Sequence, residues 1–303
     1  MHCANIPEFE KGRGWVGQRV SGYATSPGVV REHNEDSLCI RPDLGLWAVA
    51  DGMGGYKAGE KASRITVEQL AEDLGHHIPL SESIYGIHDK ILSAARTDSA
   101  YESMGSTLVA LKVDGNNYEI AWVGDSRAYL WHGRQLTRLT RDHSYVQSLV
   151  DAGTISKAEA EIHPERHAIT QALGADSIDS VEVETIKGPF HENDKILLCS
   201  DGLTNELADE EIVSILSQTG SEQSIAEQLI AAAQKNGGKD NISAILVGPD
   251  PAPSVEVNSE NANLQQANSV AIEGRIHGLQ FWLWMVLAFL ALFIAVVVVY
   301  DII

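Results

Sequence analysis

The chain has 303 residues, of which 44% are hydrophobic and 21% charged, and its 42 Asp and Glu against 22 Lys and Arg give a formal charge of −20. This composition is typical of a globular protein and excludes a wholly disordered or fibrous chain. Nucleic-acid binding is not expected, because phosphates would be repelled and no basic run compensates. Three cysteines, Cys3, Cys39 and Cys199, lack C-x-x-C spacing. They fit neither a disulfide framework nor a zinc site and indicate reduced thiols facing a cytoplasm.

The first 17 residues are predicted to be an extension that precedes the folded domain. They contain no continuous apolar run and include Glu8 and Glu10. A secretory signal is therefore not expected.

Residues 18–248 are predicted to form one globular domain. Strand-like runs occur at 19–25, 37–40, 46–50, 107–113, 118–123, 127–131, 181–187, 195–199 and 242–247. Helical spacing occurs at 58–74, 83–95, 210–216 and 222–234. A polar, His-rich and weakly helical segment lies between them at about 142–173. Many strands with long paired helices indicate an α+β fold in which helices cover sheets.

The C-terminal part contains two segments that differ in composition from the globular domain and from each other. Residues 249–278 are rich in Pro, Asn, Ser, Gln and Glu without aromatics, which predicts a flexible linker. Residues 279–300 carry no charge and span roughly 33 Å as a helix, about one bilayer core, so we expect a single transmembrane helix rather than a buried core helix. Arg275 and His277 before it favour a cytoplasmic N-terminal domain. Residues 301–303 are a short tail, which makes this helix a C-terminal anchor in the cell (inner) membrane.

Aspartates recur at the ends of the predicted strands. Asp51 and Asp201 each follow a strand directly and precede glycine, Asp125 follows another strand, and Asp36 and Asp240 precede strands. Each alone is more simply interpreted as a turn residue, because Asp-Gly is a common turn pair. Five such sites favour a functional cluster instead, because rigid elements commonly hold catalytic groups at their ends.

Converging carboxylates would require cations. Two of them about 4 Å apart repel by roughly 4 kcal/mol at an effective dielectric constant near 20. Oxygen donors suit Mg²⁺ or Mn²⁺, whereas Zn²⁺ prefers His or Cys. Two divalent ions that share a bridging carboxylate can lower the pKa of a water held between them for attack on phosphorus. Arg31, five residues before Asp36, is the candidate for holding the phosphoryl oxygens.

Six segments occur in an order that resembles the motif set of the metal-dependent PP2C-type (PPM) protein serine/threonine phosphatases. They are Arg31-Glu-His-Asn-Glu-Asp36, Asp51-Gly-Met-Gly-Gly55, Gly105-Ser-Thr107, Val123-Gly-Asp-Ser-Arg127, Ser200-Asp-Gly-Leu203 and Asp240-Asn241. The resemblance covers about Gln18 to Val247. It implies an α-β-β-α sandwich, in which a central β-sandwich is flanked by helix pairs, with two Mn²⁺ or Mg²⁺ ions at one end.

The resemblance also implies a role for each matching residue. Asp51 would bridge the two metals and the Gly52 carbonyl would bind one of them, while Asp201 and Asp240 would complete the shell of the other. Glu35 and Asp36 would act largely through metal-bound waters, and Arg31 would hold the substrate phosphate. Asp125 with Asp201 would match a weaker third metal position. Asn241 would help to position the ligands without binding a metal itself.

One position departs from the animal and plant members. They commonly carry a His general acid after Asp-Gly, whereas this chain has Met53, as bacterial members do. A thioether cannot donate a proton, so a metal-bound water or another group must protonate the leaving oxygen. His33 is close in sequence, although a lone loop histidine is more often a bystander. Residues 142–173 match the flap that borders the active site in bacterial members; the alternative is a variable surface insertion.

The sequence therefore predicts a membrane-tethered phosphatase acting on phosphoserine and phosphothreonine of proteins, with substrates that a Ser/Thr kinase produces. Neither Cys39 nor Cys199 lies in a phosphate-binding loop, which argues against a thiol nucleophile. Two alternatives stay open. One is a catalytically silent phosphoprotein-binding member, and the other is a hydrolase of small phosphate esters.

Overall fold

The structure, a computed structural model, describes residues 19–175 and 181–249. The predicted extension 1–17, the linker 249–278 beyond its first residue, the membrane helix 279–300 and the tail 301–303 lie outside the described residues. The described residues belong to one compact unit. Of the helices in the described ranges, none has both the length and the apolar character that crossing a bilayer requires.

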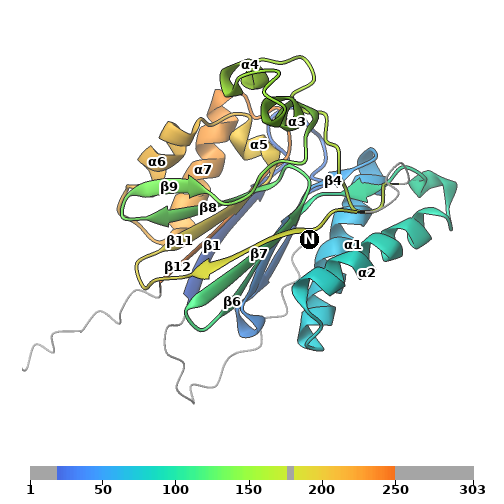
Figure 1. Cartoon of the computed structure of the whole chain (residues 1–303), viewed down its shortest axis with the longest axis horizontal. Helices are drawn as coiled ribbons and strands as arrows, with labels where there is room; N and C mark the ends of the chain where they lie inside the picture. Colours follow the sequence, from blue (N-terminus) through green and yellow to red (C-terminus); the bar gives the residue numbers. More distant parts are fainter. Residues whose placement is uncertain (1–18, 176–180, 250–303) are drawn as a thin grey trace, which may run out of the picture. The chain divides into compact units, whose positions relative to one another are not determined.

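Two five-stranded antiparallel sheets form the centre of the domain (Figure 1). The first has the order β1 (Arg19–Ser26), β12 (Ile242–Pro249), β11 (Lys195–Cys199), β8 (Arg127–His132), β9 (Gln135–Arg138). The second has the order β10 (Glu184–Pro189), β7 (Asn117–Val123), β6 (Leu108–Asp114), β3 (Leu46–Ala50), β2 (Ser37–Arg41). A small pair, β4 (Gly52–Met53) and β5 (Gly105–Ser106), lies beside the second sheet's helices.

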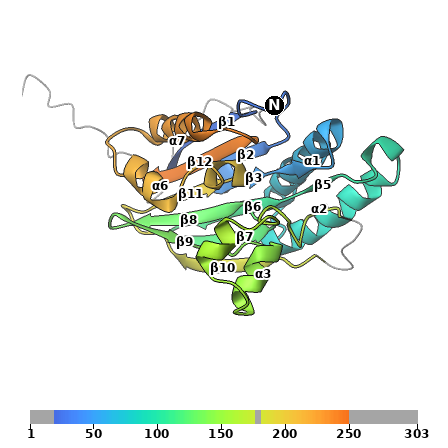
Figure 2. The same cartoon turned by 90° about the horizontal axis from the view of Figure 1, so that it is seen from above.

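Helices cover both outer faces, as Figure 2 shows from above. The long helices are α1 (Tyr56–Gly75), α2 (Leu80–Ala95) and α7 (Glu222–Asn236). Shorter ones are α3 (Tyr145–Asp151), α4 (Lys157–Glu161), α5 (Asp201–Thr204), α6 (Asp209–Leu216), η1 (Pro42–Leu44) and η2 (Ser99–Tyr101). Helices α1 and α2 pack on the second sheet, and α5, α6 and α7 lie on the first.

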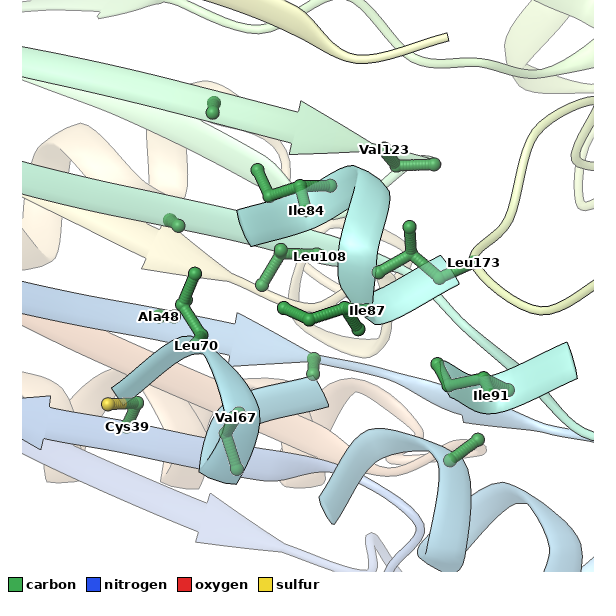
Figure 3. Close-up of a cluster of buried hydrophobic side chains, with 14 of the residues drawn as sticks. Cys39, Ala48, Val67, Leu70, Ile84, Ile87, Ile91, Leu108, Val123 and Leu173 are labelled. Atoms are coloured by element: carbon green, nitrogen blue, oxygen red, sulfur yellow. The ribbon is translucent and has the colours of Figure 1, made fainter. Parts of the chain in front are cut away.

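Three buried clusters correspond to the three contacts between these four layers. Strand β3 shows why: Trp47 and Val49 face the other sheet, whereas the alternate residues Leu46 and Ala48 face α1 and α2. Figure 3 shows Leu70 of α1 and Ile84, Ile87 and Ile91 of α2 gathered with sheet residues such as Ala48, Leu108 and Val123. The α-β-β-α sandwich predicted from the sequence is thus present.

Three details differ from the sequence prediction. The strand expected at 181–187 begins at Glu184, because Val181 and Val183 pack into the helix-side core instead of pairing with β7. Strand β12 continues to Pro249, which pairs with Arg19, so the domain is one residue longer than predicted. Strand β9 was not predicted because its residues are mostly polar, and β4 and β5 were not predicted because each has two residues.

Candidate active site

The strand register brings the five aspartates to one end of the sandwich. In an antiparallel pair the end of one strand lies beside the start of its neighbour. Ala50 pairs with Ser37, so Asp51 and Asp36 adjoin. Cys199 pairs with Ala244 and with Arg127, so Asp201 emerges beside the residues that precede β12 and beside the turn that carries Asp125.

The backbone of Asp51 is held from both sides by Thr107. The Asp51 N–H donates to Thr107 Oγ1 at 3.1 Å, and the Thr107 N–H donates to the Asp51 carbonyl at 2.8 Å. Thr107 Oγ1 also lies 2.8 Å from Ser126 Oγ. This explains the Gly-Ser-Thr motif: Thr107 fixes the residue predicted to bridge the metals.

Gly52 is required by close packing. A Cβ on Gly52 would meet the Gly59 carbonyl oxygen at 2.1 Å and the Glu35 carbonyl oxygen at 2.7 Å. A Cβ on Gly59 would in turn lie 1.9 Å from Glu35 Oε2. The absence of both side chains lets the first turn of α1 approach β4 and leaves room for the Glu35 carboxylate beside the backbone of Gly52.

Asp36 joins the two sheets. It is buried, and its Oδ2 accepts a hydrogen bond from Ser200 Oγ at 2.9 Å across the sandwich. Ser200 Oγ itself accepts from the N–H of Ser243 at 3.0 Å. Asp36 Oδ1 is buried without a hydrogen-bond partner. An unsatisfied carboxylate oxygen is costly, so a cation or a water it binds would stabilise this position.

Asn241 supports the loop that carries the predicted phosphate-binding motif. Its Oδ1 accepts from the Glu35 N–H at 2.8 Å, and its Nδ2 donates to the carbonyls of His33 at 2.8 Å and Pro27 at 3.2 Å. Gly202 allows this arrangement, since a Cβ there would lie 2.0 Å from the Asn241 carbonyl oxygen. Asn241 therefore positions loop backbone behind the aspartates.

Arg31 lies at the rim of the aspartates. Its guanidinium is 3.0 Å from Asp240 Oδ2, and both side chains are substantially exposed, at 56% and 41%.

Asp201 is held by Asn205, whose Nδ2 donates to Asp201 Oδ2 at 2.9 Å. Met53 is half-buried, and His33 is exposed on the loop of Arg31.

The carboxyl groups repel one another strongly. Burial raises the pKa of Asp51 well above its usual range, and further rises come from the charges of Asp36, Asp201, Asp125 and Asp240. Burial and then Asp201 raise the pKa of Asp125 well above its usual range, and burial and then Asp240 raise that of Asp201. Burial raises the pKa of Asp36 to about 7, against the hydrogen bonds from Ser243 and Ser200. These mutual effects place the five side chains in one electrostatic cluster, called the aspartate cluster below.

The donor set suits a hard divalent cation. It consists of carboxylates and a backbone carbonyl, with no thiolate or imidazole among the predicted ligands. Within residues 19–175 and 181–249, no three Asp, Glu, His or Cys side chains are grouped so as to hold an ion by themselves. The expected metal shell adds water and the Gly52 carbonyl to Asp51, Asp201 and Asp240.

The predicted flap joins this end of the domain. Ser106 bridges to Leu173, and His143 exchanges backbone hydrogen bonds with Gly124 and Thr170. Burial and Asp240 raise the pKa of Asp201, and His167 partly offsets this rise, which places this flap residue close to the cluster. Neither His167 nor Ser243 has a role that could be predicted from the sequence. A single His in a polar segment and a Ser in a strand carry no distinguishing pattern.

Comparison with known proteins agrees with this fold. The protein phosphatase 2C family matches residues 30–246. The serine/threonine phosphatase stp of Listeria welshimeri is 37% identical over 238 residues, covering 74% of this chain and 94% of stp. The chain belongs to the protein phosphatase 2C family, and the predicted family and enzyme class, a phosphatase, are confirmed.

Solved structures extend the likeness to three dimensions. Serine/threonine phosphatase Stp1 from Staphylococcus aureus superposes with a TM-score of 0.71 at 32% identity, covering 81% of this chain and all of that one. The catalytic domain of the phosphatase PstP in complex with two manganese ions has a TM-score of 0.68 at 33% identity, covering 76% of this chain and 98% of that one.

Proposed function

We propose that this protein hydrolyses phosphoserine and phosphothreonine on proteins, with two Mn²⁺ or Mg²⁺ ions bound at the aspartate cluster. The observation that carries the proposal is the convergence of five aspartates at one end of the sandwich, which the strand register produces. A cluster of like charges at rigid strand ends is stable at neutral pH when cations neutralise it. The names of the relatives and the manganese ions bound to PstP support the same choice.

The ligand roles are those that the family resemblance implies. Asp51 and the Gly52 carbonyl would hold one ion, and Asp51, Asp201 and Asp240 the other. Glu35 and Asp36 would act through water, and Asp125 with Asp201 would offer a weaker third position. Bound divalent ions would supply charge neutralisation and a water of lowered pKa as nucleophile.

Arg31 is the group for substrate binding. Its guanidinium is more than half exposed beside Asp240, so it can present two N–H donors to a phosphoryl group at the rim. A planar fork matches phosphate oxygens better than a lysine ammonium does. Arg31 would therefore orient the phosphoryl group over the cluster, with the flap residues facing the rest of the substrate.

The test uses residues 1–250, which contain all three cores. Turnover of a phosphothreonine peptide, a phosphotyrosine peptide and p-nitrophenyl phosphate is measured with Mn²⁺ and with EDTA. We expect Mn²⁺-dependent turnover that is fastest on phosphothreonine. Turnover that survives EDTA would overturn the metal proposal. A preference for the small ester would favour a small-ester hydrolase, and no turnover of any substrate would favour a phosphoprotein-binding member.

We further propose that residues 279–300 anchor the protein in the cell (inner) membrane with the catalytic domain in the cytoplasm. The support is the run of apolar residues without charge, preceded by Arg275 and His277. Its substrates would then be phosphoproteins made by a Ser/Thr kinase at the same membrane face. Protease treatment of sealed, right-side-out vesicles should leave the domain intact; its digestion there would reverse the orientation.

A further inference from the structure

Two exposed histidines meet at the end of the sandwich opposite to the aspartate cluster. His132 ends β8, and His191 lies in the turn between β10 and β11. Their rings are 5.7 Å apart between centroids and inclined by 53°. Figure 1 shows the β8–β9 hairpin reaching away from β4. Along β8, His132 is about 17 Å from Arg127, which lies next to the site.

We propose that His132 and His191 form a second metal site, for a borderline transition ion such as Zn²⁺, with Asp194 as the residue that positions His132. Imidazole nitrogens prefer Zn²⁺ or Cu²⁺, whereas the oxygen donors of the aspartate cluster prefer Mg²⁺ or Mn²⁺. The two sites would therefore select different ions. Water molecules would complete the coordination of an ion held by two protein ligands.

Asp194 fixes the tautomer of His132. Its Oδ1 lies 2.6 Å from His132 Nδ1, and the Asp194 side chain is only 1% exposed whereas that of His132 is 63% exposed. A carboxylate at Nδ1 favours the proton on that nitrogen, which leaves the lone pair of Nε2 available to an ion. Metal-ligating histidines are commonly oriented by a carboxylate in this way.

The position of Asp194 is itself determined by the turn. Its Oδ2 accepts the His191 N–H at 2.9 Å, and its own N–H donates to the His191 carbonyl at 3.1 Å. The Asp194 carboxylate thus contacts both the ring of His132 and the backbone of His191. The spacing of the rings also fits, since two imidazoles bound to one zinc place their centroids roughly 5–6 Å apart.

The surrounding charges do not oppose a cation. Glu192 is exposed in the same turn and Asp194 faces His132. Arg19 is a nearby cation, and its guanidinium is occupied by the carbonyls of Phe190 at 2.7 Å and His191 at 2.9 Å and lies 3.7 Å from the Phe190 ring centre. Arg19 therefore braces the turn from the side of the backbone.

The experiment measures Zn²⁺ binding to residues 1–250 by equilibrium dialysis in millimolar Mg²⁺. We expect one saturable equivalent of Zn²⁺ that is lost in His132→Ala and in His191→Ala. It should persist in His76→Ala, which removes an exposed histidine elsewhere. Asp194→Asn should keep the equivalent but weaken it about 10–100-fold.

The controls separate binding from folding and from the active site. Thermal unfolding of His191→Ala without Zn²⁺ should match the wild type, because this side chain is exposed. His132→Ala and Asp194→Asn alter a hydrogen bond of the buried Asp194, so a cooperative unfolding transition is the check that these two variants are folded. Equal Zn²⁺ stoichiometry in the wild type and in the His132→Ala/His191→Ala double variant would overturn the site. Unchanged affinity in Asp194→Asn would overturn the positioning role. Neither result depends on phosphatase activity, so the proposed function is tested separately.

Discussion

Two groups of acidic side chains at the active-site end have opposite electrostatic partners. In the aspartate cluster, burial and mutual repulsion raise the pKa of Asp51, Asp125 and Asp201. Asp142 lies near the same end, since its charge also raises the pKa of Asp125, but it is matched by two arginines. Its carboxylate accepts from Arg127 at 2.8 Å and 3.1 Å and also from Arg138.

The pKa of Arg127 also reflects its pairing with Asp142. Burial lowers the pKa of Arg127, but the charges of Asp142 and Tyr129 and the hydrogen bonds to both together outweigh it, and the pKa of Arg127 is raised well above its usual range. The negative charge of Asp142 is balanced by two arginines of the protein. The negative charges of the aspartate cluster have no such partners and would be balanced by a bound cation. Asp142 therefore belongs to the framework, whereas the aspartate cluster is available to the proposed metal ions.

The largest effect that would test this contrast is expected from Asp51→Asn. The change keeps the shape of the side chain but removes the charge predicted to hold both ions. We expect phosphothreonine-peptide turnover at saturating Mn²⁺ to fall by about 10³-fold or more, because the ions generate the nucleophile. The EDTA-treated variant should unfold at the same temperature as the wild type or higher, because one repelling carboxylate is gone.

The matched control is Asp43→Asn. Asp43 forms an ion pair with Arg41 at 2.7 Å in the η1 turn. This variant should retain full turnover. If Asp51→Asn kept more than a tenth of the wild-type turnover, the aspartate cluster would not be the metal centre.

Much of this candidate site could be predicted from the sequence because its aspartates lie at the ends of strands that the apolar residues identify. The apolar runs at 46–50 and 195–199 locate Asp51 and Asp201 at strand ends, and both strands have the predicted bounds. Thr107 was identified only as part of a motif; its two hydrogen bonds to Asp51 join residues 56 positions apart. Local sequence contains no information on such a pair.

The remaining parts depend on register and on long-range pairing. Ser200 reaches Asp36 across 164 residues, and His132 reaches Asp194 across 62. Arg127 belongs to a recognised motif, but its partner Asp142 was assigned to the flap because nothing in the sequence links the two. Strand β9 has mostly polar residues, and β8 pairs with it through a tight hairpin rather than through a hydrophobic pattern.

Asp142→Asn is the next largest test, and its effect should be on stability. Removal of the shared carboxylate leaves Arg127 and Arg138, whose side chains are 25% and 28% exposed, without their charged acceptor. We expect the free energy of unfolding to fall by about 1.5–3 kcal/mol in urea titrations. Turnover at saturating Mn²⁺ should change far less than in Asp51→Asn.

An exposed ion pair is the comparison for this variant. Asp151 pairs with Arg141 on the flap, where water screens the charges. Asp151→Asn should leave the urea midpoint unchanged. A similar stability for Asp142→Asn and the wild type would remove the distinction between framework acids and cluster acids.

The smallest expected effect is a change in the pH dependence of stability. An aspartate in the unfolded chain titrates near pH 4, whereas the pKa of Asp36 in the folded domain is about 7 and those of Asp51, Asp125 and Asp201 are raised. Between about pH 4 and 7 the metal-free folded state therefore binds more protons than the unfolded state. Its stability from these groups is present at low pH and is lost as the pH rises through 7.

Bound Mn²⁺ should reverse this trend, because the ions favour the charged carboxylates. We expect the unfolding temperature in EDTA to fall by a few degrees between pH 5.5 and 8. The increase in unfolding temperature that Mn²⁺ causes should be larger at pH 8 than at pH 5.5. In Asp51→Asn both the fall and the increase should shrink, since one member of the cluster no longer titrates. An EDTA unfolding temperature that rises with pH over this interval, in the wild type but not in Asp51→Asn, would mean that the carboxylates of the cluster are stabilised by the protein itself. The cluster would then resemble Asp142 with its arginines, and the contrast between the two groups of acids would fail.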